Sequence, residues 1–301
     1  MNKIQFTGIL PALVTPLDKK GRVKAETVKK LVDDQLAAGV DGFYVVGGTG
    51  EGVLLSVDQR EAMAEAAVAA NAGRGKVIVH TGSINSGEVM ELTRHATKIG
   101  ADGISSILPS VYFGYSMEET IDFYKQLAAN TNLPVIVYAN HTGNNIDINK
   151  MIDRLMAVEN IAGAKDTRNH YFLMWQLKRL NGGNINVING PDESLLCGLT
   201  MGADGGIGCN YNLMPELFVA LYRKFLANDL AGAQAVQDRI NRVISVTVGW
   251  SGGNIIRPVK ASLRLSGYDV GSAVYPASDY SDEELKAFKR AMEEAGYVYS
   301  R

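Results

Sequence analysis

The feature that most constrains the fold is an eightfold alternation of short apolar runs with longer amphipathic segments. The apolar runs, which we interpret as strands, cover residues 8–17, 42–48, 76–82, 103–109, 134–140, 161–166, 184–190 and 205–210. Most of the intervening segments repeat apolar residues at helical spacing, as residues 25–38 and 86–99 do. Because strands joined through helices pair in parallel, the pattern predicts a repeated strand–helix architecture.

Three of the joints between helix and strand share the motif Gly-(Val/Ala)-Asp-Gly, which begins at Gly39, Gly100 and Gly202. Each copy supplies a glycine to end a helix and an Asp-Gly turn before the next strand. We therefore expect an α/β protein of one domain, with a (β/α)8 TIM barrel in residues 1–225 and C-terminal helices in residues 226–301. No Gly-x-Gly-x-x-Gly motif opens a helix after the first strand, which argues against a dinucleotide-binding sheet.

Composition argues against several classes of function. The 301 residues carry a net charge of −2, so no basic surface indicates nucleic acid or an anionic membrane as a partner. Two cysteines, and four histidines without ligand spacing, predict no disulfide framework and no metal site. The N-terminus lacks the apolar run of a signal peptide, and no stretch reaches the ~18 apolar residues of a membrane span. We therefore expect a cytoplasmic protein.

Lys165 most strongly indicates chemistry, because it follows the apolar residues 161–164 at the end of a predicted strand. The active sites of such barrels lie at the C-terminal ends of the strands. Burial disfavours the charged ammonium form, and a neutral amine attacks a ketone or aldehyde to give a Schiff base. The alternative is a lysine whose charged end extends into solvent.

Other strand ends place polar groups at the same rim. The glycine-rich loop 47–52, which contains Gly48 and Thr49, exposes N–H groups that can hold a carboxylate, or it is simply a flexible turn. Tyr138 ends the fifth strand and can transfer protons to a substrate on Lys165, unless its ring only fills the core. His141 follows in the next loop, where a histidine is more often incidental.

The seventh and eighth strands end in groups that suit a polyhydroxy ligand. Asp192 and Glu193, which follow Gly190, can accept hydrogen bonds from sugar hydroxyls, although both also suit the start of a helix. The small residues around 206–210 leave room for a ligand. Together with an amine and a phenol, these groups suit a 2-keto acid that is bound as an imine while a C–C bond forms or breaks.

These motifs resemble the class I pyruvate aldolases of the dihydrodipicolinate synthase/N-acetylneuraminate lyase family. The resemblance rests on the segment 8–16, the Gly-Thr-Gly-Glu loop 48–51, Tyr138, and the Gly-x-Lys-Asp-Thr segment around Lys165. It implies that Lys165 binds pyruvate or another 2-keto acid as a Schiff base, without a metal or other cofactor. It also implies that Tyr138 is the acid/base relay and that the protein is a homotetramer.

The resemblance further assigns residues that bind the substrate. Gly48 and Thr49 would hold the pyruvate carboxylate, and Thr167 would contact the substrate near the imine. A tyrosine from a neighbouring subunit supports the relay tyrosine in this family, and Tyr112 is the better match for it. The rest of the substrate site would comprise Gly190 and Ile207 and, at the polyhydroxy tail, Asp192, Glu193 and Cys209.

The lyase branch of the family fits best, because no arginine follows Tyr138, where the synthase branch usually has one. We therefore expect a carbon–carbon lyase that cleaves N-acetylneuraminate to pyruvate and N-acetylmannosamine. Gly48 stands where both branches usually have Ser or Thr, and Cys209 stands where the lyase usually has Ser. The alternatives are a 4-hydroxy-tetrahydrodipicolinate synthase, a 5-dehydro-4-deoxyglucarate-type dehydratase, and a barrel that binds a keto acid without turnover.

Overall fold

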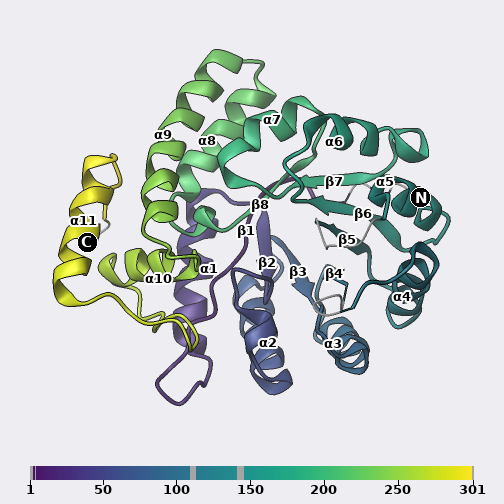
Figure 1. Cartoon of the computed structure of the whole chain (residues 1–301), viewed down its shortest axis with the longest axis horizontal. Coiled ribbons are helices and arrows are strands. Elements are labelled where there is room, and N and C mark those ends of the chain that lie inside the picture. The colour runs from purple at the N-terminus through teal and green to yellow at the C-terminus, as the bar shows by residue number, and fades with distance from the viewer. Residues whose placement is uncertain (1–2, 4, 109–112, 141–145, 300–301) are drawn as a thin grey trace.

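Eight parallel strands form a ring that helices surround (Figure 1). The computed structural model describes residues 3, 5–108, 113–140 and 146–299. The strands are β1 (Gly8–Pro11), β2 (Gly42–Val45), β3 (Lys76–His80), β4 (Gly103–Ser106), β5 (Val135–Ala139), β6 (Ile161–Asp166), β7 (Asn186–Asn189) and β8 (Gly205–Gly208). β1 pairs with β8, and a parallel bridge from Ala12 to Tyr44 joins β1 to β2, so the ring closes. The predicted (β/α)8 barrel is confirmed.

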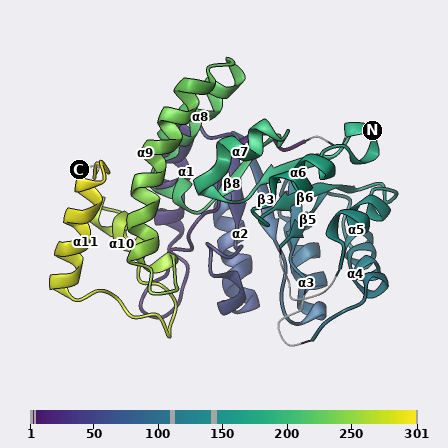
Figure 2. The same ribbon diagram turned by 45° about the horizontal axis from the view of Figure 1, so that its top comes forward.

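Helices alternate with these strands and continue beyond them. The barrel helices are α1 (Ala25–Ala38), α2 (Val57–Asn71), α3 (Ser86–Lys98), α4 (Met117–Ala129), α5 (Ile148–Leu155), α6 (Tyr171–Leu177), α7 (Leu195–Thr200) and α8 (Pro215–Leu226). The C-terminal extension comprises α9 (Leu230–Gly249), α10 (Ile256–Leu265) and α11 (Asp282–Glu294), which lie together at one side of the barrel (Figure 2). α8 and α9 pack against each other, and the boundary at residue 225 stays a prediction. In the described part of the chain, no helix has the length and apolarity needed to span a membrane.

The recurring Gly-(Val/Ala)-Asp-Gly joint has a structural reason beyond its turn. Its first glycine adopts the positive φ that ends a helix: 96° at Gly39, 82° at Gly100 and 101° at Gly202. Its aspartate accepts a hydrogen bond from a backbone N–H of the preceding strand: Asp41 from Ile9 (2.8 Å), Asp102 from Val77 (2.9 Å) and Asp204 from Val187 (2.8 Å). Each copy therefore ties the start of one strand to its predecessor.

The apolar side chains form two clusters. The larger one fills the space between the strands and the helices. The smaller one fills the inside of the ring and comprises Phe6, Leu10, Ala12, Tyr44, Ile78, Ile136, Ala162, Ile188 and Ile207. Because successive strand residues point to opposite faces, His80 follows Ile78 and Tyr138 follows Ile136 on the inner face. The ends of β3 and β5 therefore present these two side chains at the mouth of the barrel.

Candidate active site

A bulge in β6 decides which of its side chains enters the barrel. β5 and β6 pair residue by residue except at one point, where Val135 faces Ile161 and the next pair is Ile136 with Gly163. Ala162 is thus the extra residue, and a bulge of this kind reverses the alternation of side chains beyond it. Ala162 and Lys165 both face inward as a result, whereas Ala164 packs in the outer cluster.

Lys165 is enclosed by aromatic groups at the mouth of the barrel. It is 7% exposed, and its Nζ donates to the phenol oxygen of Tyr138 across 3.4 Å. The same nitrogen lies 4.5 Å from the ring centroid of Tyr138 and 4.9 Å from that of Tyr44. These contacts rule out the alternative of a lysine extended into solvent. The phenol oxygen is therefore within reach of substrate atoms bonded next to the Lys165 nitrogen, to or from which it can transfer a proton.

The glycine-rich loop after β2 is tightly built, so it is not simply a flexible turn. Val46 adopts a left-handed φ of 52°, and a Cβ at Gly52 would lie 2.0 Å from the Val46 carbonyl oxygen. Gly48 differs, because a Cβ there would meet no atom within 4 Å. Thr49 is half-buried beside it, close enough to the Cys209 thiol for its side chain to oppose the rise in the pKa of that thiol. The loop thus leaves open space at Gly48, next to the half-buried Thr49 side chain.

A buried ion pair anchors this loop to the C-terminal extension. Glu51 is 3% exposed and Lys260 of α10 is fully buried, and their charged atoms lie 2.6 Å apart. Glu51 also accepts a hydrogen bond from the Val274 N–H (2.6 Å), and Lys260 donates to the Ser272 carbonyl (2.9 Å). Burial lowers the pKa of Lys260, and the charge of Glu51 opposes that drop. This pair was not predicted from the sequence, although a lysine among apolar residues in α10 was a visible signal.

Replacing Lys260 with methionine is expected to lower the free energy of unfolding by about 3–5 kcal/mol, because Glu51 stays buried without its partner. Urea denaturation of the whole chain measures the effect. The double variant Lys260→Met/Glu51→Gln should regain much of the loss, since a neutral amide oxygen can still accept from Val274. Equal stability of the single and double variants would contradict the prediction. Lys224→Met, which removes an exposed ion pair with Asp229, is the matched control and should cost at most ~1 kcal/mol.

Asp192 holds the loop after β8 and does not cap a helix. Its carboxylate accepts hydrogen bonds from the backbone N–H groups of Cys209 (3.1 Å) and Asn210 (2.6 Å) and from the Asn210 side-chain amide (2.9 Å). Burial raises the pKa of Asp192 to about 6 despite these bonds. Burial, followed by the charge of Asp192, raises the pKa of the Cys209 thiol to about 12, so this thiol stays protonated. That Asp192 binds a ligand stays a prediction. In the structure its carboxylate also fixes the loop after β8 through Cys209 and Asn210.

The other residues predicted at this rim fall into three groups. Thr167 is half-buried and donates to the Ala139 carbonyl (3.0 Å), and a Cβ at Gly190 would lie only 2.2 Å from its methyl group. Glu193 is exposed, whereas Ile207 is fully buried inside the ring, so the ligand contact of each stays a prediction. Tyr112 and His141 lie outside the described residues.

Two inward-facing side chains near Lys165 were missed by the sequence analysis. Tyr44 is buried, and its hydroxyl donates to Ser105 (3.1 Å). His80 is buried between the rings of Tyr44 and Tyr138, with a centroid distance of 6.0 Å to each. Their positions on β2 and β3 could have indicated them, because alternate residues of a strand face the same side and both residues face the inside of the ring. The sequence alone does not show which face of a strand points into the barrel, so these two side chains could not be assigned to the site.

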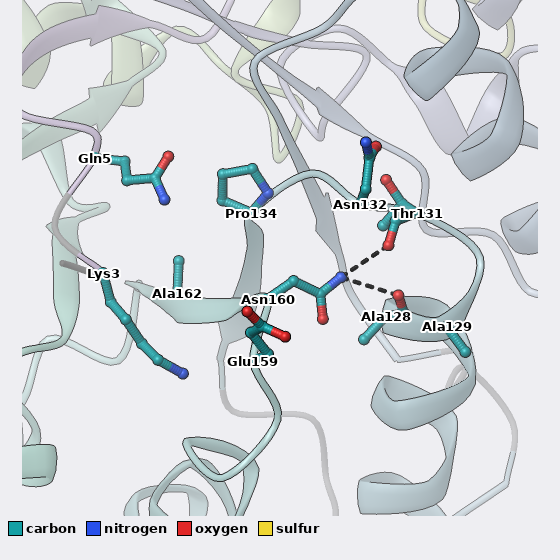
Figure 3. Close-up of a pocket in the computed structure, with 10 residues that line it drawn as sticks. All are labelled: Lys3, Gln5, Ala128, Ala129, Thr131, Asn132, Pro134, Glu159, Asn160 and Ala162. Atoms are coloured by element: carbon teal, nitrogen blue, oxygen red, sulfur yellow. Dashed lines mark hydrogen bonds between the residues drawn. The ribbon is translucent and has the colours of Figure 1, made fainter. Parts of the chain in front are cut away.

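A cavity of about 540 Å³ lies at the opposite end of the barrel (Figure 3). It is lined by residues that precede or begin β5 and β6, among them Pro134 and Ala162, and by Lys3 and Gln5 of the N-terminal segment. Asn160 points toward Ala128 and Thr131, and its side-chain amide donates to the carbonyls of Ala128, Thr131 and Leu133. In barrels of this kind, residues at the N-terminal face serve stability. The cavity is therefore separate from the Lys165 site.

Comparisons with known proteins agree with this geometry. A model of the dihydrodipicolinate synthetase family matches residues 5–295. The N-acetylneuraminate lyase of Rhizobium meliloti (strain 1021) is 35% identical over 294 residues, which cover 96% of this chain and 95% of that protein.

Solved structures are similar over almost the whole chain. The N-acetylneuraminate lyase of Proteus mirabilis aligns with a TM-score of 0.91 at 27% identity, covering 98% of this chain and all of that one. YagE, a prophage protein of the dihydrodipicolinic acid synthase family from E. coli K12, was solved in complex with pyruvate. It aligns with a TM-score of 0.90 at 28% identity, covering 97% of this chain and 99% of its own. The similarity thus includes the barrel and the C-terminal helices.

Proposed function

The chain belongs to the dihydrodipicolinate synthetase family, and on that basis we propose that it cleaves N-acetylneuraminate to pyruvate and N-acetylmannosamine through a lysine Schiff base. The observation that carries this proposal is the buried amine of Lys165, held 3.4 Å from the phenol oxygen of Tyr138 at the mouth of the barrel. The 35% identity with an N-acetylneuraminate lyase supports N-acetylneuraminate as the substrate over those of other family members.

The proposed reaction begins when the Lys165 amine attacks the C2 ketone of the substrate. A proton from the Tyr138 phenol allows water to leave, which gives a protonated imine beside the Tyr138 phenolate. The bond between C3 and C4 then breaks, and its electron pair moves into the imine to form an enamine. The oxygen of Tyr138 accepts the proton of the C4 hydroxyl, so that C4 becomes the aldehyde of N-acetylmannosamine. Tyr138 returns this proton to C3, and hydrolysis of the resulting imine releases pyruvate and restores Lys165.

The remaining roles follow from position. We propose that Thr49 and the backbone at Gly48 hold the substrate carboxylate, since they flank open space after β2. Thr167 and Gly190 lie against each other after β6 and β7. We propose that they line the path of the sugar toward Asp192, Glu193 and Cys209.

Borohydride reduction in the presence of pyruvate tests the chemistry. We expect one pyruvate-derived mass on the chain, located at Lys165 by peptide mapping. No added mass, or a label on another residue, would overturn the proposal. Release of pyruvate from N-acetylneuraminate tests the substrate, with 5-dehydro-4-deoxyglucarate and a pyruvate–aldehyde condensation assayed in parallel. Trapping without turnover of any of these would indicate a keto-acid-binding protein.

Replacing Gly48 with serine is expected to lower the KM for N-acetylneuraminate roughly 10-fold. The new hydroxyl enters open space beside Thr49, where it can bond the substrate carboxylate, and a hydrogen bond to a charged group contributes about 1.5–3 kcal/mol. Steady-state kinetics with both proteins measures the change. Gly52→Ser is the matched control, because its Cβ would lie 2.0 Å from the Val46 carbonyl oxygen and should disrupt the loop. An unchanged or higher KM for Gly48→Ser would show that the carboxylate does not bind there.

We further propose that the enzyme works without a metal and as a homotetramer in which Tyr112 of one subunit supports Tyr138 of another. Among the described residues, no three His, Cys, Asp or Glu side chains form a group that could hold a metal ion. Exposed aromatic side chains on α6, Phe172 and Trp175, offer an apolar surface for subunit contact. Undiminished turnover in EDTA and a tetrameric mass in analytical ultracentrifugation are the expected results.

A further inference from the structure

His80 packs against Tyr44 and Tyr138, the two aromatic rings beside the Lys165 amine, yet the proposed reaction does not use it. It ends β3 and is 4% exposed. Its ring meets that of Tyr138 edge to face, at an interplanar angle of 75°, and is tilted by 47° to that of Tyr44. These are the two rings beside which Nζ of Lys165 lies. A shift of the imidazole would therefore move the groups that surround the amine.

The hydrogen bonding of His80 requires a neutral ring. Its Nε2 accepts a hydrogen bond from the backbone N–H of Ile107 across 3.2 Å, which is open only to an unprotonated nitrogen. Burial, followed by the charges of Arg60 and Lys165, lowers the pKa of His80 to about 3. The backbone of Val46 opposes this drop in pKa. The other ring nitrogen, Nδ1, is buried and has no hydrogen-bond partner among the described residues. The ring thus stays neutral at physiological pH.

The surroundings of His80 hold both its ring and its backbone in place. A Cβ at Gly82 would lie 2.8 Å from Cε1 of the ring and 2.8 Å from a methyl carbon of Ile107, so only glycine permits this packing. The buried guanidinium of Arg60 donates to the carbonyl of His80 across 2.9 Å. Ile107 in turn directly follows β4, which ends at Ser106.

We propose that His80 is a positioning residue: its hydrogen bond with Ile107 holds the imidazole edge-on to Tyr138 and so fixes the phenol oxygen next to Lys165. The same bond fixes the point at which the chain leaves β4. His80 acts through Tyr138 and contacts no reacting atom. This inference rests on the proposed function, because it needs Tyr138 as the proton relay.

The test uses exchange of the methyl protons of pyruvate into D2O, followed by NMR, which needs the imine and the relay but no sugar. His80→Phe keeps a ring and removes the acceptor, and exchange should slow by about 10²-fold, the usual cost of a small misplacement of a reacting group. His80→Gln offers an oxygen close to the position of Nε2 and should recover at least ~10-fold of that loss. Borohydride trapping of pyruvate on Lys165 should stay complete in both, because the amine is untouched.

His95→Phe is the matched control, because His95 lies on α3 and pairs with Glu65 away from Lys165, and it should exchange at the wild-type rate. Wild-type exchange in His80→Phe, or equally slow exchange in His80→Gln and His80→Phe, would overturn the inference. Loss of trapping together with exchange would also overturn it, since that result means a general collapse of the site. Failure of the wild-type protein itself to trap pyruvate would instead overturn the proposed function, and the inference with it.

Discussion

Replacing Lys165 with alanine is expected to abolish cleavage of N-acetylneuraminate, with a loss on the order of 10⁶-fold, as when the nucleophile of a covalent catalyst is deleted. No other lysine can substitute, because Lys165 alone has its Nζ against the phenol oxygen of Tyr138 among the described residues. Without an imine, the electron pair of the breaking C–C bond has no acceptor. The measurement is pyruvate release, together with borohydride trapping, which should also be lost.

Lys125→Ala is the control for this experiment, since Lys125 is exposed on α4 and should be replaceable without effect on turnover. Circular dichroism should show that Lys165→Ala keeps its fold, because alanine fits the inner face of a strand. If Lys165→Ala retained more than ~1% of the wild-type rate, the imine mechanism would be wrong.

Replacing Tyr138 with phenylalanine is expected to lower kcat by roughly 10²–10⁴-fold, the usual contribution of a general acid/base. The ring still packs beside His80 and Lys165, so the site keeps its shape and only the hydroxyl is missing. Trapping of pyruvate on Lys165 should persist, because solvent can supply the proton that imine formation needs. The variant should thus separate imine formation, which it keeps, from proton transfer, which it loses.

Tyr222→Phe provides the comparison for this variant, because its hydroxyl donates to the Asp204 carbonyl, before the start of β8 and away from Lys165. It should turn over at the wild-type rate. Should Tyr138→Phe lose less than ~10-fold in kcat, the proton relay would have to be another group.

The barrel and its helices followed from the sequence because their signals are local. The alternation of apolar runs and amphipathic segments recurs within short stretches, and α1 begins and ends at the predicted residues, 25 and 38. One helix start was less certain: Asp192 and Glu193 suited the start of a helix, but they lie in a short 3-10 turn, Asp192–Ser194, and α7 starts at Leu195.

Long-range partners could not be predicted. Glu51 and Lys260 are 209 positions apart in the chain, and nothing in either local segment indicates the other. Asp192 suited a helix start, yet its carboxylate bonds to the loop after β8. Both cases concern buried charges, which need a partner wherever the fold provides one.

The sequence by itself determined the repeated strand–helix order, and with it the rim at which Lys165 and Tyr138 would meet. Only the tertiary structure decided that Lys165 enters the barrel, because the extra residue at Ala162 reverses the face on which the side chains beyond it lie. Only the tertiary structure also enclosed His80 between two aromatic rings. The physical reason is that the face of a strand depends on its register with its neighbours, and register is a property of the closed ring.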